Sequence, residues 1–412
     1  MRTDQNSAFG TNFQRVFYPK LSASWVASDE NFFPRTSWLN QLRLRGAYGA
    51  SGVQPGATSS FQTFSTTTIN VASVDRPGLR ANALGNADLK PETSAELETG
   101  FDARVLNNRV NVEFTYYNKK TRDALINQPI APSAASSAAS VLKNLGSVQN
   151  SGVELTLNST ILDRRSFGWD LTVAASHNSN KVVSLGRDAN GQPNPTIGTG
   201  GTRDSVGLPV NAYFYQPYTW SDANGDGYLT ANEVIVSPDV VYRGYSLPRD
   251  LVSFQNGFDF FHRHLRLTAL LDYKGGSSVL NASLQFQCQQ SPNPCYDISN
   301  PHAALWRQAR AVAETQGTVV NGTKVTTVGG YLENAQFWRL REAAATLTLP
   351  QRFAARVRAR DISLTLSARN LHLWTNYTGT DPESNYGVGD TQQDFATTSP
   401  RRYFITRLNL HY

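Results

Sequence analysis

One segment of the sequence has the residue spacing of a calcium-binding loop. Its candidate ligands are Asp222, Asn224, Asp226, Tyr228 (through its carbonyl) and Glu233. Calcium takes about six to eight oxygen ligands, and a glutamate at the end of such a loop supplies two of them. Gly227 stands where the loop needs its sharp turn, so the spacing matches the calcium-loop pattern completely.

The surroundings of this segment differ from those of an EF-hand, in which a helix stands on each side of the loop. Pro217 precedes the segment, Pro238 follows it, and no helical pattern is evident beside either. Clusters of Asp, Asn and Gly are also common in surface turns that bind no metal. The sequence therefore leaves two interpretations open, a calcium site and a turn.

The chain has two cysteines, Cys288 and Cys295, which lie in a polar stretch. No histidine stands close enough along the chain to complete a tetrahedral metal site with them. Cysteine pairs that face an oxidising exterior are commonly joined. We therefore expect a disulfide between Cys288 and Cys295 rather than a metal site.

The sequence offers no constellation for catalysis. It has no Ser/His/Asp order, no phosphate-binding loop and no pair of carboxylates in a setting that favours acid–base chemistry. The net charge of +6 comes from residues that are dispersed along the chain. Such a distribution is typical of a solvated surface, or of the basic interior (lumen) of a channel, rather than of nucleic-acid binding. We expect neither an enzyme nor a nucleic-acid partner.

Residues 95–121 show which kind of element must position these side chains. In the first arm apolar residues such as Leu97, Phe101 and Val105 alternate with charged ones, and after Asn107 and Asn108 the return arm repeats the alternation. A period of two indicates antiparallel strands with one apolar and one polar face. Each arm has about ten residues, which is the length of a tilted membrane-spanning strand, whereas soluble strands average about five or six.

The composition agrees with a membrane barrel. Charged residues make up 17% of the chain and aromatic residues 11%, while the mean hydropathy is negative. A barrel combines these features because its lipid-facing side is apolar and its lumen and loops are polar. No run of about eighteen apolar residues occurs, so helical membrane spans are excluded.

The same alternation recurs along the chain and predicts eleven spanning strands. They are expected at residues 16–27, 41–50, 95–105, 110–121, 150–160, 168–178, 251–261, 264–274, 336–349, 361–370 and 403–412. A change of phase near Glu342 indicates a β-bulge. Short turns alternate with long loops, which we expect on the extracellular side at about residues 51–93, 122–145, 181–250, 275–335 and 372–401.

The predicted fold class is all-β: a transmembrane antiparallel β-barrel, of which residues 1–412 form the C-terminal portion with about 11 of about 22 strands. An odd number of strands does not close a single-chain barrel with antiparallel pairing throughout. The first residues, MRTDQNSAFG, lack the apolar stretch of a signal peptide. We therefore expect the signal peptide, a plug domain and the first half of the barrel to be missing.

Two further sets of residues could bind a solute. Six arginines would face the lumen, where pairing with carboxylates is a commoner role than guiding an anion: Arg43, Arg45, Arg339, Arg341, Arg369 and Arg407. Two groups of loop aromatics could stack on sugar rings, although packing or an interfacial girdle is the favoured interpretation: Tyr213, Phe214, Tyr215, Tyr218 and Trp220, and Trp374 with Tyr377.

Six blocks of sequence, in this order, resemble the C-terminal half of SusC/RagA-type TonB-linked outer-membrane proteins. They are LKPETSAELETGFD (residues 89–102), TYYNKKTRDAL (115–125), NLGSVQNSGVELTLN (144–158), SDANGDGYL (221–229), FWRLREAAATLTLP (337–350) and LTLSARNLHLWTNYTGTDPE (364–383). The resemblance covers nearly the whole chain. It implies a place in the outer membrane of a Gram-negative bacterium, in contact with its lipid.

The resemblance also implies a function. Proteins of this type import oligosaccharides or oligopeptides through a plugged barrel, usually with a SusD-like surface lipoprotein. The TonB energising complex would act only through an N-terminal part that this chain lacks, so we expect the chain to be inactive alone. The alternative is a secreted or surface carbohydrate-binding or adhesive β-protein with a calcium loop. Strand length distinguishes the two, because ten-residue strands suit a membrane.

Overall fold

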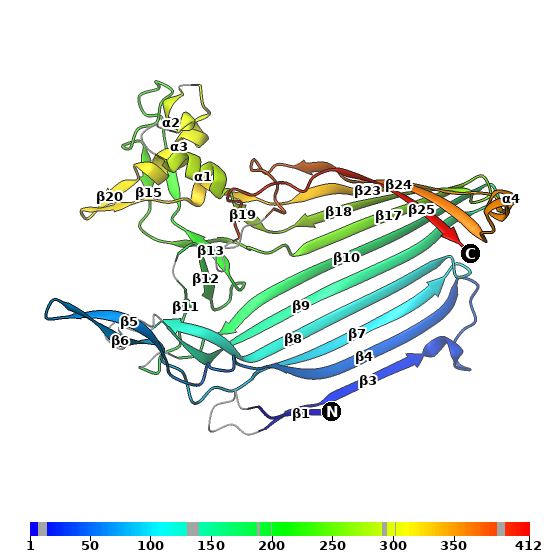
Figure 1. Cartoon of the computed structure of the whole chain (residues 1–412), viewed down its shortest axis with the longest axis horizontal. Helices are drawn as coiled ribbons and strands as arrows, with labels where there is room; N and C mark the ends of the chain where they lie inside the picture. Colours follow the sequence, from blue (N-terminus) through cyan, green and yellow to red (C-terminus); the bar gives the residue numbers. More distant parts are fainter. Residues whose placement is uncertain are drawn as a thin grey trace.

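The computed structural model describes residues 1–6, 15–129, 140–187, 190–198, 200–290, 295–300, 302–384 and 392–412. Its main element is an open antiparallel sheet of 11 strands in the order β25-β24-β23-β18-β17-β10-β9-β8-β7-β4-β3 (Figure 1). The strands are β3 (Lys20–Val26), β4 (Leu39–Val53), β7 (Glu92–Val105), β8 (Val110–Pro129), β9 (Ser140–Asp163), β10 (Phe167–Ser184), β17 (Asp250–Phe260), β18 (Leu265–Gly275), β23 (Phe337–Thr348), β24 (Asp361–Thr375) and β25 (Tyr403–His411).

The 11 predicted strands are therefore confirmed, and each pairs with the next spanning strand along the chain. One face of the sheet is apolar and uncovered. Leu21 on β3 is 77% exposed and Phe404 on β25 is 80% exposed, and between them Leu44, Leu97 and Leu366 are also exposed. A sheet in water would bury such a face, whereas lipid solvates it, so this side of the sheet is a membrane-facing wall.

Short connections lie at one end of the sheet and long ones at the other. We call these the short-turn end and the long-loop end. Asn107 and Asn108 make the tight turn between β7 and β8 with φ angles of 57° and 61°, a conformation that asparagine tolerates. The short-turn end also carries η1 (Ala27–Asp29), α4 (Gln351–Ala354) and η3 (Ala355–Val357), as the position of α4 in Figure 1 shows.

The expected β-bulge is confirmed, and its extra residue is Arg341. On β18, Leu270 pairs with Glu342 and Leu271 with Leu340, so Arg341 has no partner of its own in that register. The pairing of β23 with β24 shifts at the same place. The bulge explains why the apolar phase of this strand changes.

Two expectations about the strands need correction. The strand expected at residues 16–27 is interrupted at Pro19, giving β2 (Val16–Tyr18) and β3. Proline has no N–H to donate, and β2 pairs instead with β1 (Arg2–Asp4). Several strands are also longer than expected, and β9 reaches 24 residues. Backbone pairing continues beyond the apolar segment, because it does not depend on which side chains face lipid.

The loops expected at residues 51–93 and 122–145 are therefore partly strands. The first contains a hairpin, β5 (Thr63–Val71) and β6 (Val74–Ala83), which projects from the long-loop end in Figure 1. In the second, β8 continues to Pro129 and β9 begins at Ser140. Residues 130–139 lie outside the described residues.

The two longest connections fold into a small structured layer. Residues 185–249 contain β11 (Thr196–Ile197), β12 (Thr202–Ser205), β13 (Ala212–Tyr215), β14 (Tyr218–Trp220), β15 (Val234–Val236) and β16 (Val241–Gly244). Residues 276–336 contain β19 (Ser278–Leu280), α1 (Ala282–Gln289), α2 (Tyr296–Ser299), α3 (Leu305–Thr315), β20 (Thr318–Val320), β21 (Thr323–Val325), η2 (Gly329–Tyr331) and β22 (Leu332–Asn334).

The alternation of polar and apolar residues does not predict these helices. Helix α3 is buried on most sides, and its Ala309, Val312 and Ala313 pack against Val234 and Val236 of β15. Within the described ranges, no helix combines the length and the apolar character that a membrane span requires. We call residues 212–244, 278–290, 295–300, 302–334, 376–384 and 392–400 together the cap.

Candidate functional site

The calcium-type loop connects β14 and β15, which pair with each other. Tyr218 lies opposite Val236 and Trp220 opposite Val234, so the loop begins and ends on adjacent strands rather than on helices. Ser221 N–H donates to the Glu233 carbonyl at 3.0 Å and closes the loop at its base. The expectation that helices do not flank this loop is confirmed.

The loop's own backbone occupies its acidic side chains. The two oxygens of Asp222 accept from the Gly225 and Gly227 amides at 2.8 and 3.1 Å. Asp226 Oδ1 accepts from the Tyr228 amide at 2.8 Å. Asn224 Oδ1 accepts from the Asp226 amide at 3.0 Å. These bonds hold the candidate ligands on one side of a compact turn.

Glu233 is held by the same kind of contact. Its two oxygens accept from the Ala223 amide and from the Thr230 amide and hydroxyl, at 2.9 to 3.0 Å. The bonds from Thr230, and then that from Ala223, lower the pKa of Glu233 below its ordinary value. An ionised Glu233 at neutral pH suits a cation, but its oxygens already have donors.

The loop is fixed to a helix from a distant part of the chain. Gln308 of α3 accepts from the Leu229 amide and donates to the Gly227 carbonyl, both at 2.9 Å. Gln308 is almost fully buried. This support could not be predicted from the sequence, because a lone glutamine some eighty residues away carries no local signal.

The carboxylates of the loop do not converge on one point. Among the described residues, one group of three His, Cys, Asp or Glu ligand atoms lies within 4.8 Å of one another, and it consists of Cys288, Cys295 and Asp297. Asp222, Asp226 and Glu233 form no such group there. Calcium binding by the loop thus stays a prediction.

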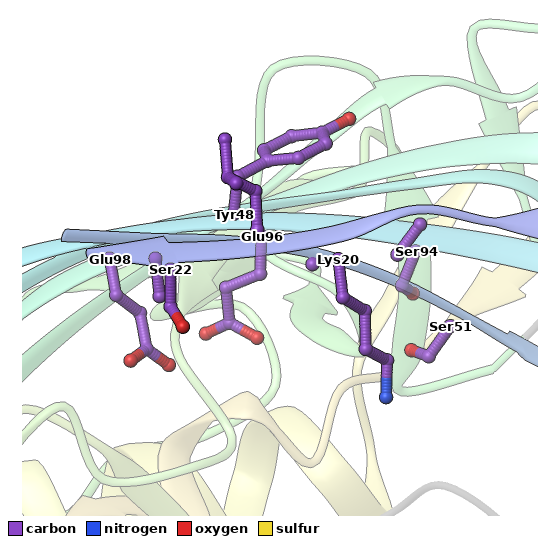
Figure 2. Close-up of a pocket in the computed structure, with 11 residues that line it drawn as sticks. Lys20, Ser22, Tyr48, Ser51, Ser94, Glu96 and Glu98 are labelled. Carbon is purple, nitrogen blue, oxygen red and sulfur yellow. The ribbon is translucent and has the colours of Figure 1, made fainter. Parts of the chain in front are cut away.

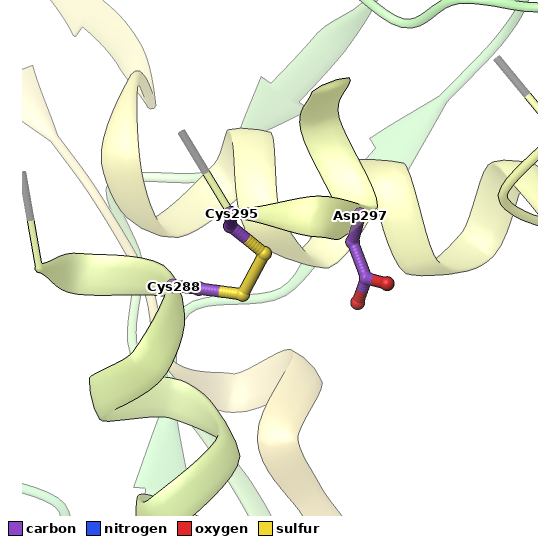
Figure 3. A group of neighbouring side chains, drawn as sticks. All are labelled: Cys288, Cys295 and Asp297. Atoms are coloured by element: carbon purple, nitrogen blue, oxygen red, sulfur yellow. A yellow bond between two sulfur atoms is a disulfide. The ribbon is translucent and has the colours of Figure 1, made fainter. Parts of the chain in front are cut away.

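The two cysteines join α1 to the start of α2. Their sulfur atoms are 2.01 Å apart, and Figure 3 shows the bond between them with Asp297 close by. Both cysteines are buried in a cluster with Ala311 and Tyr331. Asp297 is occupied by other partners, because its carboxylate pairs with Arg307 at 2.9 Å and with Arg310 at 3.2 Å. The disulfide and the two arginines therefore explain why Cys288, Cys295 and Asp297 lie close together, without a metal ion.

Arg310 is the centre of a buried charge network that has no signal in the sequence. Its side chain is 2% exposed, and its guanidinium lies near Glu333 as well as Asp297. The faces of Trp306 and Tyr331 stand 5.0 and 4.9 Å from the guanidinium carbon. Two carboxylates and two aromatic faces compensate the buried charge, so the network fixes the helices of the cap to η2 and β22.

A second charge network attaches the cap to the barrel wall. Arg339 at the start of β23 donates to both carboxylate oxygens of Asp381 at 2.6 and 2.7 Å, and both side chains are buried. Glu383 accepts from Lys274 of β18 at 2.7 Å and from Arg341 at 2.6 and 2.7 Å. We call Lys274, Arg339, Arg341, Asp381 and Glu383 the clamp.

The clamp keeps Glu383 ionised. Burial acts to raise the pKa of Glu383, but the hydrogen bonds from Arg341 and Lys274 outweigh burial and lower it to about 2. The bulge at Arg341 turns this arginine toward both Glu383 and Asp272, which accepts from it at 2.6 Å. Bulges re-aim side chains in this way. The sequence indicated the bulge but not its partners.

Most of the six arginines expected in the lumen pair with carboxylates. Arg43 and Arg45 of β4 both contact Asp102 of β7. Arg369 of β24 pairs with Glu342 of β23 at 2.5 Å. With Arg339 and Arg341 in the clamp, five of the six are ion-paired as expected. No ion pair is found for Arg407 within the described part of the chain.

A different part of the polar face is acidic and unpaired. Lys20, Glu96 and Glu98 line a hollow of about 410 Å³ across β3, β4 and β7, and in Figure 2 their charged groups project to the side opposite the Tyr48 ring. Glu113 and Glu154 line a neighbouring hollow with Glu96 and Glu98. Within the described residues these four glutamates form no ion pair. The polar face therefore carries negative charge over β7, β8 and β9.

The loop aromatics mostly pack inside the cap. Tyr213 is fully buried and donates to the Gln392 carbonyl, and burial raises its pKa. Burial also raises the pKa of Tyr215 to about 12. Tyr377 is buried and donates to Asp394 at 3.1 Å. Packing was the favoured interpretation and is confirmed for these three, while Trp220 and Trp374 stay 41% and 49% exposed.

The structure is an open antiparallel wall with one lipid-facing side and a structured cap at its long-loop end, and its sequence matches a known family. The profile of the family described as TonB dependent receptor-like, beta-barrel, matches residues 1–289. The chain belongs to this family. It is therefore a protein of the outer membrane of a Gram-negative bacterium, and its family consists of transporters rather than enzymes.

Similar proteins agree with this assignment. The chain is 27% identical to TonB-dependent receptor P26 of Formosa agariphila over 96% of this chain and 42% of that protein. It is 28% identical to TonB-dependent receptor SusC of Bacteroides thetaiotaomicron over 45% of this chain and 19% of that protein. The family type expected from the sequence, SusC/RagA, is confirmed.

Solved structures show the same fold. The RagAB peptide importer in its 'closed-closed' state superposes with a TM-score of 0.77 and 23% identity, over 99% of this chain and 45% of that chain. The RagAB peptide transporter superposes with a TM-score of 0.76 over 45% of its chain. The chain thus spans less than half the length of these relatives, and its sheet corresponds to part of a receptor barrel.

Proposed function

We propose that this chain forms part of the wall and cap of a TonB-dependent importer of oligosaccharides or oligopeptides. Family membership and the likeness to a peptide importer support the class of transporter. The observation that carries the proposal is the clamp. It ties the 376–384 segment to β23 through the buried Arg339–Asp381 pair and to β18 through the partly buried Lys274–Glu383 pair. A cap held this firmly can present a defined binding surface above a lumen.

The proposal includes two partners. A SusD-like surface lipoprotein would cover the long-loop end, which is where the cap and the β5–β6 hairpin project. The RagAB complex, to which this fold is similar, supports such a partner. The TonB energising complex would act through a part of the receptor other than these 412 residues. The 412-residue chain by itself would then be inactive.

The test of import is growth on defined nutrients. The gene is deleted in its host, and growth is measured on a panel of oligosaccharides and a panel of oligopeptides as sole carbon source. Loss of growth on one panel, restored by the intact gene and abolished again by deletion of TonB, is the expected result. Unchanged growth and uptake on both panels would refute the proposal. Affinity purification of the intact receptor from solubilised outer membranes tests for the lipoprotein.

The orientation of the barrel has its own test. Thr68→Cys lies in the β5–β6 hairpin and Ser166→Cys lies in the turn between β9 and β10, and both positions are exposed. A membrane-impermeant maleimide should label Thr68→Cys on intact cells and should label Ser166→Cys after the outer membrane is opened. The reverse pattern would invert the proposed topology. The family match argues against the alternative of a secreted adhesive protein.

A further inference from the structure

The charge of the connections differs between the two ends of the sheet. The five connections at the short-turn end, residues 27–38, 106–109, 164–166, 261–264 and 349–360, contain nine arginines and two acidic residues. At the long-loop end, the connections between spanning strands hold twelve Lys or Arg residues and fifteen Asp or Glu residues. One end of the wall is therefore strongly basic and the other is not.

The basic charge is densest on the turn between β23 and β24. Arg352, Arg356, Arg358 and Arg360 fall within nine residues of the chain, and all four are exposed. Within the described residues none of them forms an ion pair or donates a side-chain hydrogen bond. Four adjacent guanidinium groups without counter-charges raise the electrostatic energy of the turn, unless an anion neutralises them.

The turn itself is well supported, so it presents these arginines in fixed places. Ala354 and Ala359 are buried in a cluster with Ile362 and Leu349. Backbone bonds close the turn: the Ala359 amide donates to Ala354 at 3.0 Å, and the Leu349 amide donates to Ile362 at 2.9 Å. The buried alanines point inward and leave the intervening long side chains outside.

Aromatic side chains accompany the arginines at this end. Phe353 is 39% exposed, and the guanidinium carbons of Arg352 and Arg356 lie 4.9 and 5.7 Å from its ring centre. Phe32, Trp38 and Phe261 of the other short connections are more than half exposed. Aromatic rings beside basic groups are typical of the headgroup level of a bilayer, where one part of the residue is in apolar and the other in polar surroundings.

We propose that the short-turn end, centred on residues 350–360, binds the phosphate groups of anionic phospholipids in the adjoining membrane leaflet. Guanidinium groups bind phosphate through two parallel hydrogen bonds, which gives arginine an advantage over lysine at such a site. Leu347 of β23 and Leu410 of β25 are exposed apolar residues that pair with Leu364 and Ile362, close to this turn, so the lipid-facing side of the sheet reaches it. A lipid therefore satisfies the arginines and the aromatic rings together, which a soluble anion cannot do.

The test uses the protein as its host makes it, purified from the outer membrane in a non-ionic detergent. Native mass spectrometry counts bound lipid after addition of phosphatidylglycerol or, separately, phosphatidylethanolamine. The expected result is preferential binding of phosphatidylglycerol. In the variant R352Q/R356Q/R358Q/R360Q its apparent affinity should fall by about tenfold or more, with phosphatidylethanolamine unaffected.

A matched control removes the same charge elsewhere. Arg76, Arg80, Arg401 and Arg402 are exposed at the long-loop end and form no ion pair in the described part of the chain. The variant R76Q/R80Q/R401Q/R402Q should keep the affinity for phosphatidylglycerol. If the first variant does not fold, as judged by its circular dichroism in detergent, the pairs R352Q/R356Q and R358Q/R360Q replace it, and each should lose part of the affinity.

Several results would overturn the proposal. Equal binding of the two lipids by the unaltered protein would show that the arginines are only solvated. Equal losses in the two charge-matched variants would show a general charge effect. Full competition by inorganic phosphate at the same concentration as the lipid would show a soluble-anion site. Binding of poly-glutamate in place of phosphatidylglycerol would indicate an acidic protein partner instead.

Discussion

Arg339 and Asp381 form a buried two-bond ion pair that joins a spanning strand to the cap. The guanidinium of Arg339 is 2.6 and 2.7 Å from the two carboxylate oxygens of Asp381, and the side chains are 3% and 1% exposed. Removing one partner of such a pair leaves a buried charge uncompensated, which costs about 3–5 kcal/mol.

We predict that Arg339→Gln and Asp381→Asn each release the 376–384 segment from the barrel wall. Hydrogen exchange of amides in this segment, followed by mass spectrometry, should speed up by about two orders of magnitude or more. Arg263→Gln is the control, because its pair with Asp163 is exposed and such pairs contribute about 0–1 kcal/mol. Equal exchange in all three variants would show that the buried pair does not hold the segment.

The clamp should weaken in acid. The pKa of Glu383 is lowered from an ordinary value of 4.5 to about 2. A carboxyl with a lowered folded-state pKa stabilises the fold above its ordinary pKa, and the stabilisation is lost as the pH falls toward the lowered value. We predict that the 376–384 segment is better protected in the parent than in Glu383→Gln at pH 7. This advantage should shrink between about pH 4.5 and 2, as hydrogen exchange would show. A difference that persists unchanged at pH 2 would contradict the assignment.

The calcium interpretation predicts a measurable heat. Titration of the purified protein with calcium chloride should give one binding event, and Glu233→Ala should abolish it by removing the bidentate ligand. Asp239→Ala, an exposed acidic position beyond β15, is the control and should bind as the parent does. If the parent gives no calcium-dependent heat, the loop is a turn held by its own amides.

If Cys288 and Cys295 form a disulfide, the mass of the alkylated protein should depend on whether a reductant was added first. Alkylation of the denatured protein should modify neither cysteine until a reductant is added, and both afterwards. The double variant Cys288→Ser with Cys295→Ser should lose about 2–3 kcal/mol of stability in the α1–α2 region, since the bond closes a short loop with a sequence separation of 7. Alkylation of both cysteines without reductant would show that they are free.

The 412-residue chain expressed alone should fail to form a closed barrel. Strands β3 and β25 are the two edges of the 11-stranded sheet. A barrel satisfies its edges by pairing them, and unpaired backbone groups in lipid cost several kcal/mol each. With a signal peptide attached, the chain should give no heat-modifiable folded band on a gel. That band, together with liposome permeability caused by the purified monomer, would refute this prediction.

The barrel wall could be predicted from the sequence because its signal is local. In a strand that faces lipid on one side and water on the other, apolar and polar residues must alternate. The polarity of neighbouring residues such as Leu97 and Glu98 therefore indicates which side of the sheet each one faces. The bulge at Arg341 was visible for the same reason, as a change of phase. Pro19 marked a break that alternation alone did not reveal, because its effect is on backbone pairing rather than on polarity.

The cap and its contacts were decided only by the tertiary structure. Asp381 and Arg339 lie 42 positions apart, and Gln308 reaches a loop about eighty positions away. No periodicity of the sequence predicts such pairs, because they depend on which folded loops come into contact. The basic short-turn end has the same origin only in part. Four of its nine arginines are neighbours along the sequence, at residues 352–360, whereas the other five come from four separate connections that the antiparallel order of the strands brings to the same edge. The local alternation of polarity thus determines the barrel wall, whereas long-range packing and charge pairing determine the structure of the cap and of the short-turn end.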